Sequence, residues 1–279
     1  MAEVVGREEL VVRWTVGDVS AEGFEALRLS IYGARRVFGP TPAYVVCVNN
    51  VPLGRARSLT GRVPADTRWL DATHLLSPLI DAHTDEGRAE GVGWKFAPLR
   101  LAPNRPELHL DNDCILWGLP DAVAEWLQEG GIRCLLAEDV VTMLGQFQPF
   151  CGPEPRNSGI RGVPAAFDLE AELAQILRAT GITLRSELDE QGLVTLACSR
   201  RAPPYVVELN EVTICGPFPP HRQWLGRSGA HFAGLNAKQL PWAHAGRPGE
   251  AYIREHWRHH RPHLYAVLEV ADHPPSKEE

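Results

Sequence analysis

Short apolar runs of strand length alternate in this sequence with apolar stripes at helical spacing. AYVVCV at 43–48 is an almost continuous apolar run, typical of a strand buried on both faces of a sheet. Before it, Phe24, Leu27 and Ile31 recur at spacings of three and four, which predicts a helix with Ser20 as its N-cap. This alternation predicts an α/β fold with a mixed, mostly parallel central sheet.

The same pattern continues towards the C-terminus. Helices are expected over 120–128 and from an N-cap at Asp168 to Gly181, where glycine ends the pattern. No repeat or linker interrupts the alternation, so we expect one domain over 1–270 and a polar tail over 271–279. Further strands are expected at 13–18, 107–113, 132–137, 205–215 and 265–270.

Composition excludes several classes of protein. A chain of 279 residues with 44% hydrophobic content can bury a full-sized core, and a net charge of -7 argues against a nucleic-acid surface. No apolar stretch reaches membrane-spanning length, and the acidic N-terminus does not read as a signal peptide. The six cysteines form no CxxC pair, which favours buried, reduced thiols and a cytoplasmic protein.

Polar residues follow three of the apolar runs: Asp18, Asn49-Asn50 and Asp111-Asn112-Asp113. In open α/β sheets the ligand binds beyond the carboxyl ends of the strands. Side chains two apart in extended backbone point to the same side, so both carboxylates of the acidic pair can hold one Mg²⁺ or Mn²⁺ ion that is shared with substrate phosphates. The alternative is a solvated acidic loop.

Four segments in order resemble the glycosyltransferases of GT-A fold, and more closely the retaining glycosyltransferase family 8. ELHLDNDCILWGLP resembles the Asp-x-Asp region, and RNSGIRGVP at 156–164 is similar to an Asn-Ser-Gly segment. ELDEQG at 187–192 resembles an Asp-Gln segment, and HFAGLNAKQLPW at 231–242 resembles the closing His-x-x-Gly segment. The resemblance implies a GT-A domain and a metal-dependent enzyme that transfers a sugar, with retention, from a nucleotide-sugar donor such as a UDP-sugar.

The resemblance also implies a ligand set for the metal. His231 joins Asp111 and Asp113 on the ion, and neutral imidazole is an acceptable ligand for manganese beside carboxylates. Without the resemblance, His231 reads as an ordinary loop histidine. Gly234 nearby lets the backbone approach a phosphate closely.

Other candidates would contact the donor. Thr15, Gly17 and Asn49 end the first two strands, where GT-A enzymes place the base and ribose, and Asn112 lies between the two carboxylates. Lys95 and Arg100 lie in a segment that the resemblance implies is helical, and one or both of them would reach the phosphates or the donor sugar. Lys238 would neutralise the leaving diphosphate, although it stands one residue later than the family pattern predicts.

The sugar-facing candidates are Asn157, Asp189, Glu190 and Gln191. Asn157 can hydrogen-bond sugar hydroxyls or an acceptor, or simply belong to a turn. A capping box at 186–189 would place the other three at a helix start, whereas DEQG could instead be a hairpin turn between two strands. Which of the three side chains points inward stays open.

The segment REHWRHHRPH contains His256 and His260, which share one helical face. With arginines around them and no third ligand in sight, a solvated helix face is expected rather than a metal site.

Two other functions compete with sugar transfer. A sugar nucleotidyltransferase would carry a glycine-rich basic loop after its first strand, but WTVGDVSAEG contains two acidic residues and no lysine. A non-catalytic GT-A-like domain that binds a sugar or a partner protein is the other alternative. The acceptor, whether a saccharide, a small molecule or a protein, is not readable from the sequence.

Overall fold

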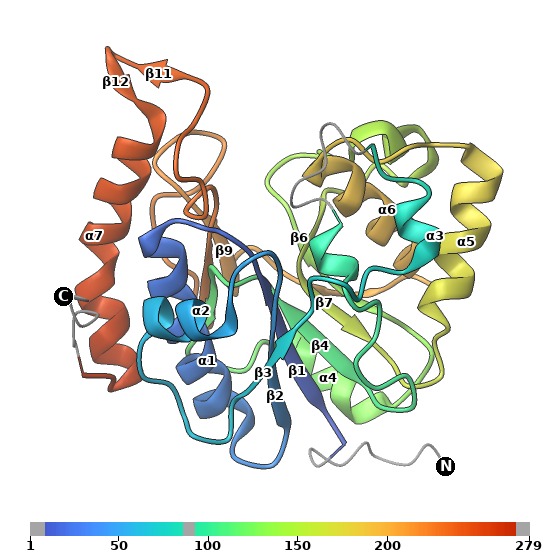
Figure 1. Ribbon diagram of the computed structural model, residues 1–279, viewed down its shortest axis with the longest axis horizontal. Helices are drawn as coiled ribbons and strands as arrows, with labels where there is room; N and C mark the ends of the chain where they lie inside the picture. Colours follow the sequence, from blue (N-terminus) through green and yellow to red (C-terminus); the bar gives the residue numbers. More distant parts are fainter. Residues whose placement is uncertain (1–8, 86–92, 272–279) are drawn as a thin grey trace.

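The computed structural model describes residues 9–85 and 93–271 (Figure 1). The predictions for the N-terminal leader and for nearly all of the polar tail therefore lie outside the described residues. The α-helices are α1 (Ala21–Phe38), α2 (Leu53–Thr60), α3 (Pro78–Asp81), α4 (Asp121–Glu129), α5 (Leu169–Thr180), α6 (Glu187–Ser199) and α7 (Gly249–Leu268), and the 3-10 helices are η1 (Trp94–Phe96) and η2 (Gly145–Phe150). The strands are β1 (Val11–Val16), β2 (Ala43–Val48), β3 (Arg68–Asp71), β4 (Glu107–Leu110), β5 (Cys114–Leu116), β6 (Leu135–Glu138), β7 (Arg156–Val163), β8 (Tyr205–Val207), β9 (Val212–Cys215), β10 (Gly229–Phe232), β11 (Ala243–His244) and β12 (Arg247–Pro248).

The described chain contains a seven-stranded sheet of order β3-β2-β1-β4-β7-β6-β8. Its neighbours pair in parallel except around β7, which is antiparallel to both β4 and β6. The sheet is thus mixed and mostly parallel, as the sequence predicts. Because β7 runs the opposite way, its first residues lie beside the carboxyl end of β4, and this places the 156–159 segment next to the acidic turn.

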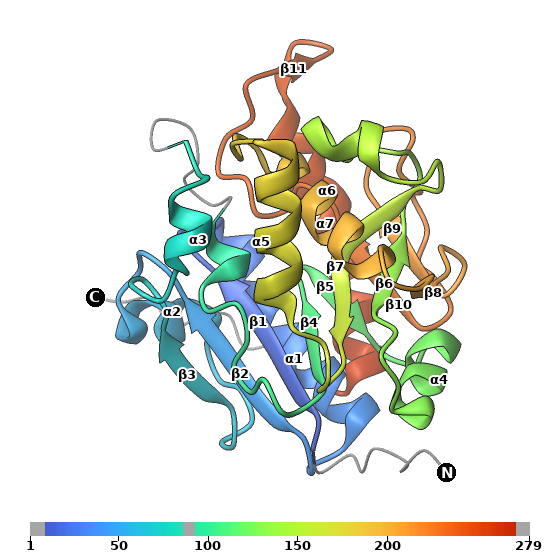
Figure 2. The same cartoon turned by 90° about the vertical axis from the view of Figure 1, so that its right-hand side faces the viewer.

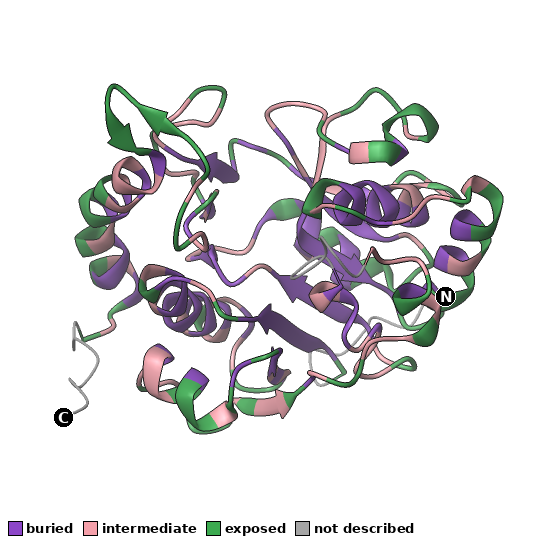
Figure 3. Ribbon diagram, turned by 45° about the horizontal axis from the view of Figure 1, so that its top comes forward, coloured by how far each residue is buried: buried purple, intermediate pink, exposed green. Residues whose placement is uncertain are grey.

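Helices cover both faces of this sheet (Figure 1). One core joins α1, α2 and α4 to the strands, and a second core joins α5 and α6 to the opposite face, which Figure 2 shows towards the viewer. Apart from the edge strand β3, the strands of this sheet are buried almost throughout, while the helices expose their outer sides (Figure 3). The apolar run at 43–48 forms β2, an interior strand with four buried residues, as the sequence predicts.

Several predicted elements are confirmed. Helix α1 begins after Ser20, whose side chain accepts a hydrogen bond from the Gly23 amide, and it ends at Gly39. Helix α5 is capped by Asp168 and ends at Gly181 in left-handed conformation. Local capping chemistry therefore specifies these boundaries well.

Two predictions about strands are wrong, and one choice that the sequence left open is decided. The run 205–215 is not one strand, because a turn separates β8 in the central sheet from β9 in a smaller one. The run 265–270 continues helix α7, where Leu264 and Leu268 are buried one turn apart. The segment 187–192 opens helix α6 behind the N-cap Ser186, so the hairpin alternative is excluded.

The smaller sheet has the order β5-β10-β9 and lies between the central sheet and α7. Strand β5 follows the acidic turn directly and pairs with β10, which contains His231 opposite Cys114. Helix α7 packs on this sheet and on α1 through a third apolar core. This arrangement brings position 231 to positions 111–113 from far along the chain.

A buried charge network ties the segment before β4 to the sheet. Arg13 of β1 is fully buried, and its guanidinium lies 3.1 Å from Glu107 and donates to the Pro98 carbonyl. Glu107 in turn accepts from the Leu101 amide. Buried charges are tolerated only when paired in this way. The network holds residues 97–101 against the sheet and so fixes η1, which precedes them.

All the cysteines lie in the described residues, and all are free thiols. Over residues 9–85 and 93–271, no helix is both long enough and apolar enough to cross a membrane.

Candidate functional site

A cavity of about 480 Å³ opens at the carboxyl ends of β1 and β4, the edge where ligands bind in open α/β sheets. It gathers residues from the ends of these strands, from the start of β7, from the first turn of α6 and from β10. Most of the residues predicted from the sequence line it: Thr15, Gly17, Lys95, Asp111, Asn112, Asp113, Asn157, Glu190, Gln191, His231 and Gly234. Asn49, Asp189 and Lys238 do not.

The two carboxylates converge through a turn and not through extended backbone, which corrects the geometry expected from the sequence. Strand β4 ends at Leu110, and the Cys114 amide donates to the Asp111 carbonyl across the turn. The Asp111 amide is held by the Gly159 carbonyl of β7. Asp113 is buried and Asp111 is partly exposed to the cavity.

His231 lies between the two acidic side chains. Its Nε2 is 3.2 Å from Asp113 Oδ1 and 3.7 Å from Asp111 Oδ2. The imidazole rests against Gly159, where any Cβ would lie 2.5 Å from His231 Cε1. A Cβ there would have to displace the ring, and this is a physical reason for glycine as the third residue of the Asn157-Ser158-Gly159 segment.

These side chains fit a hard divalent cation. One ligand atom from each of Asp111, Asp113 and His231 lies within 4.8 Å of the others. Asp113 Oδ1 is buried, and no described residue donates a well-formed hydrogen bond to it. A buried carboxylate oxygen without a donor is costly unless a cation completes its environment. Two carboxylates and one imidazole suit Mg²⁺ or Mn²⁺.

Asn112 is linked to the metal-ligand candidates through Asn236, a residue that was not singled out from the sequence. Its amide exchanges hydrogen bonds of 2.6 and 3.0 Å with the Asn236 amide, and it also donates to the Gly23 carbonyl. Asn236 then donates to Asp113 Oδ2 at 3.1 Å. Asn236 belongs to the 231–242 segment, and a polar residue inside a segment already singled out was the signal available.

A buried network of opposite charges forms the far wall. Lys95 Nζ is 3.0 Å from Asp111 Oδ2 and 3.3 Å from Glu190 Oε2. Glu190 also lies 4.0 Å from the guanidinium of Arg161, which bonds His109 Nδ1 at 2.8 Å. Arg161 and His109 could not be singled out from the sequence, because no local pattern distinguishes a charged strand residue that faces the site.

The electrostatics of the site follow from burial and pairing. Burial would lower the pKa of Lys95, but Asp111 and Glu190 outweigh it, so that pKa is raised. Burial raises the pKa of Glu190, and Lys95 opposes it only partly. For His231 burial is outweighed by Asp113 and Asp111, which raise the pKa above its usual value. A proton and a cation therefore compete for this imidazole.

Only two of the three residues predicted at the start of α6 face the cavity. Glu190 and Gln191 line the cavity, and the Gln191 amide is fixed by the Met143 carbonyl and the Ser158 amide. Asp189 faces away, because its carboxylate accepts from the Gln146 and Arg185 amides. The structure thus corrects the placement of Asp189, which caps loops behind the site.

Asn157 lines the cavity with a restrained amide. Its Nδ2 donates to Asp139 and its Oδ1 accepts from the Gly159 amide. Thr15 and Gly17 lie on the opposite side, where the Trp94 ring packs on the bare Cα of Gly17. Asn49 is buried at 2% exposure and does not reach the cavity, which corrects its expected place.

The basic residues flanking the site differ from expectation. Lys238 does not line the cavity: its Nζ pairs at 2.5 Å with Asp18, and its side chain is 51% exposed. Arg100 bonds the Pro164, Phe167 and Arg105 carbonyls and so serves a loop instead of a phosphate. Lys95 lies in a single 3-10 turn and not in the helix that was expected.

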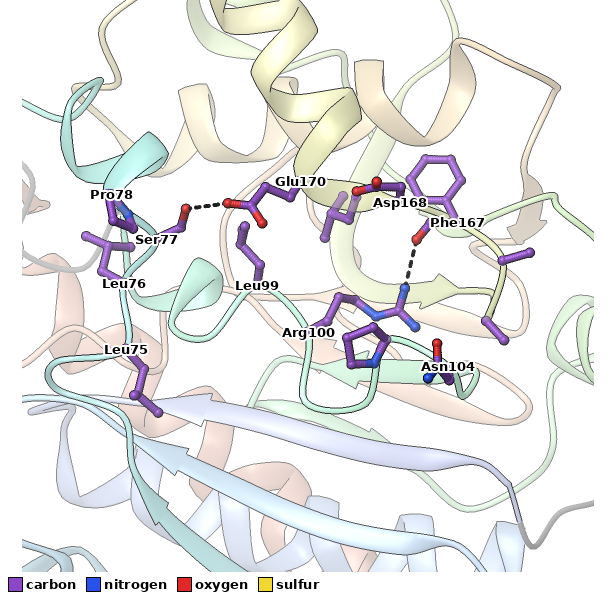
Figure 4. Close-up of a pocket in the computed structure, with 14 residues that line it drawn as sticks. Leu75, Leu76, Ser77, Pro78, Leu99, Arg100, Asn104, Phe167, Asp168 and Glu170 are labelled. Carbon is purple, nitrogen blue, oxygen red and sulfur yellow. Dashed lines mark hydrogen bonds between the residues drawn. The ribbon is translucent and has the colours of Figure 1, made fainter.

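A larger hollow of about 610 Å³ lies elsewhere, between the 75–78 and 165–170 segments (Figure 4). Its polar groups are used internally: Ser77 donates to Glu170 and Arg100 to the Phe167 carbonyl. Of the residues singled out for chemistry it contains only Arg100, whose guanidinium is occupied by backbone carbonyls. The smaller cavity, with its convergent charges, is therefore the candidate site.

No protein-family model matches this sequence, and no curated protein matches it. The structure is similar to a galactosyltransferase, LgtC, solved with donor and acceptor sugar analogues (TM-score 0.55, 12% identity, 95% of this chain and 98% of that chain). It is also similar to mouse xyloside xylosyltransferase 1 (0.51, 14%, 83% and 99%) and to the glycosyltransferase GlyE of Streptococcus pneumoniae (0.51, 13%, 94% and 62%). The resemblance inferred from the sequence is confirmed at the level of the GT-A fold.

Proposed function

We propose that this protein is a metal-dependent glycosyltransferase that moves a sugar from a nucleoside diphosphate sugar to an acceptor. The observation that carries the proposal is the convergence of Asp111, Asp113 and His231 in a cavity at the carboxyl edge of a GT-A sheet. The solved structures named above, to which this fold is similar, are those of glycosyltransferases. Because fold alone does not determine function, the site has to bear the argument.

In this proposal the three side chains hold Mn²⁺ or Mg²⁺, and a bound ion would stabilise the negative charge of the departing diphosphate. Asn236 orients Asp113 through its 3.1 Å hydrogen bond. Lys95, paired to Asp111, keeps a positive charge beside the phosphates. Gly234, with φ of +80°, leaves room for the backbone to approach them.

The sugar would lie against the start of α6. Glu190 and Gln191 line this wall with Asn157, and the Gln191 amide is held at both ends. We propose that these groups contact the donor sugar and attend the face opposite the leaving group, as transfer with retention requires. The nucleotide, for which we propose uridine, would cover Thr15 and Gly17 beside the Trp94 ring. The free thiols of this protein suit a reducing compartment such as the cytoplasm.

The test is thermal unfolding with UDP, GDP, CDP and ADP, each with Mn²⁺, with Mg²⁺ and with a chelator. A ligand at about 100 times its Kd adds about 2.7 kcal/mol of apparent stability. For a chain of this size that corresponds to a shift of about 5 °C or more. We expect a shift that requires both one nucleotide and the metal.

Variants make the test specific. Asp113→Asn should abolish the metal-dependent shift, and Asp66→Asn, which alters a surface ion pair with Arg35, should leave it unchanged. Release of free sugar or UDP from a panel of UDP-sugars then separates an enzyme from a sugar-binding domain of the same fold. Binding without turnover would favour the non-catalytic alternative, pyrophosphate release from a nucleoside triphosphate and a sugar phosphate would favour a nucleotidyltransferase, and no shift with any nucleotide would refute the donor site.

A further inference from the structure

Helix α7 does not present His256 and His260 to solvent, which corrects the solvated face expected from the sequence. His260 is buried at 9% exposure, and His256 is half-buried. Because they are four residues apart, both rings lie on one helical face, with their centroids 4.6 Å from each other. This face packs against the end of β9, where the buried thiol of Cys215 lies.

The three side chains form a compact cluster. Cys215 Sγ is 3.2 Å from His256 Nε2, and one ligand atom from each of the three residues lies within 4.8 Å of the others. The third ligand, which could not be identified from the sequence, is thus Cys215 of β9, 41 positions before His256. No local pattern could indicate it.

The donor set differs from that of the acidic site. One thiol and two imidazoles are borderline-soft ligands, which favour Zn²⁺ over Mg²⁺ or Mn²⁺. His260 Nε2 lies 3.0 Å from the Gln223 carbonyl. Zinc-bound histidines usually donate their second ring N–H to such an acceptor, which fixes the tautomer and leaves Nδ1 for the ion.

We propose that Cys215, His256 and His260 bind a zinc ion that braces helix α7 against strand β9. Three protein ligands leave the fourth tetrahedral position to water on the half-exposed side of His256. Metal binding releases the thiol proton, so Cys215 binds as the thiolate.

The position of this site gives it a structural consequence. Cys215 pairs with Phe232 across the small sheet, next to the pair Ile214 and His231. The Phe232 ring also meets Trp257 of α7 edge-on at 5.0 Å. A zinc ion here would therefore fix strand β9 and helix α7, both of which contact the strand that carries His231. The zinc site itself does not rest on the proposed glycosyl transfer.

The test uses Co²⁺ as a spectroscopic replacement for zinc in the full chain after chelation and desalting. A thiolate ligand gives a near-ultraviolet charge-transfer absorption that carboxylate and imidazole ligands alone do not give. We expect one equivalent of Co²⁺ to produce this absorption and one equivalent of Zn²⁺ to remove it. Cys215→Ala and His256→Gln should each lose it, with Co²⁺ affinity reduced at least tenfold.

Matched variants identify the site. His263→Ala, an exposed histidine of the same helix, and Cys151→Ala, a thiol remote from the cluster, should both keep the absorption. Asp113→Asn should also keep it, because the acidic site is separate. Circular dichroism confirms folding, and His256→Gln decides the question if Cys215→Ala does not fold. Absence of the absorption in the wild type, or its survival in both ligand variants, would show that Cys215 and His256 only share a hydrogen bond.

Discussion

The amide pair Asn112 and Asn236 should couple measurably, because it joins two segments far apart in the chain. Asn236→Ala removes two amide–amide hydrogen bonds of 2.6 and 3.0 Å and one of 3.1 Å to Asp113. Neutral hydrogen bonds contribute about 1 kcal/mol each and one to a carboxylate about 2 kcal/mol. Since Asn236 is only half-buried, water can replace part of this, and we expect a net loss of about 2–3 kcal/mol.

The double-mutant cycle isolates the pair. Asn112→Ala alone also loses the bond to the Gly23 carbonyl, and Asn236→Ala alone also loses the bond to Asp113. Both of these cancel in the coupling energy, which should be about 1.5 kcal/mol for the two shared bonds. Urea unfolding of the four proteins in metal-free buffer measures it.

The control is Asn104→Ala combined with Asn236→Ala, because Asn104 lies in the separate hollow and should add within about 0.5 kcal/mol. A coupling within the same limit for Asn112 and Asn236 would refute the argument that their amides hold the 231–242 segment on the acidic turn. Metal affinity gives a second reading, since loss of the hydrogen bond to a ligating carboxylate should weaken Mn²⁺ binding about tenfold or more.

Three further predictions concern other parts of the structure. Gly192→Ala should destabilise the fold by about 3 kcal/mol in urea unfolding, because its Cβ would lie 2.1 Å from the Leu144 carbonyl oxygen. Gly131→Ala, in open space, should change stability by less than about 0.5 kcal/mol. Burial and a neighbouring arginine hold the pKa of His109 well below its usual value, so only the unfolded state gains its proton as pH falls through about 6.5. Stability should then fall by up to about 1.4 kcal/mol per pH unit below that point, and a His109→Gln variant that shows the same slope between pH 7 and 5 would contradict this. Gly159→Ala should displace the His231 ring and reduce Mn²⁺ affinity at least tenfold by calorimetry with the fold retained, and an unchanged affinity would remove His231 from the ligand set.

Much of the site could be anticipated because its parts follow strands. A polar residue that ends a buried apolar run must lie at the sheet edge, and this placed Asp111, Asp113 and Thr15 correctly. The rule fails where a strand end is itself covered, as at Asn49. The rule also does not predict which side of a helix faces the cavity. Asp189 points away from the cavity, while Glu190 and Gln191 line it.

The amino-acid sequence was enough to predict the alternation of strands and helices. Apolar runs, helical stripes and caps such as Ser20 and Asp168 depend only on neighbours within a few residues. Tertiary structure alone decided which distant side chains meet. His231 reaches Asp113 because β10 pairs with β5, and Cys215 reaches His256 because α7 packs on β9. Such contacts depend on sheet order and helix packing, which the whole core sets, and no short-range pattern in the chain encodes them.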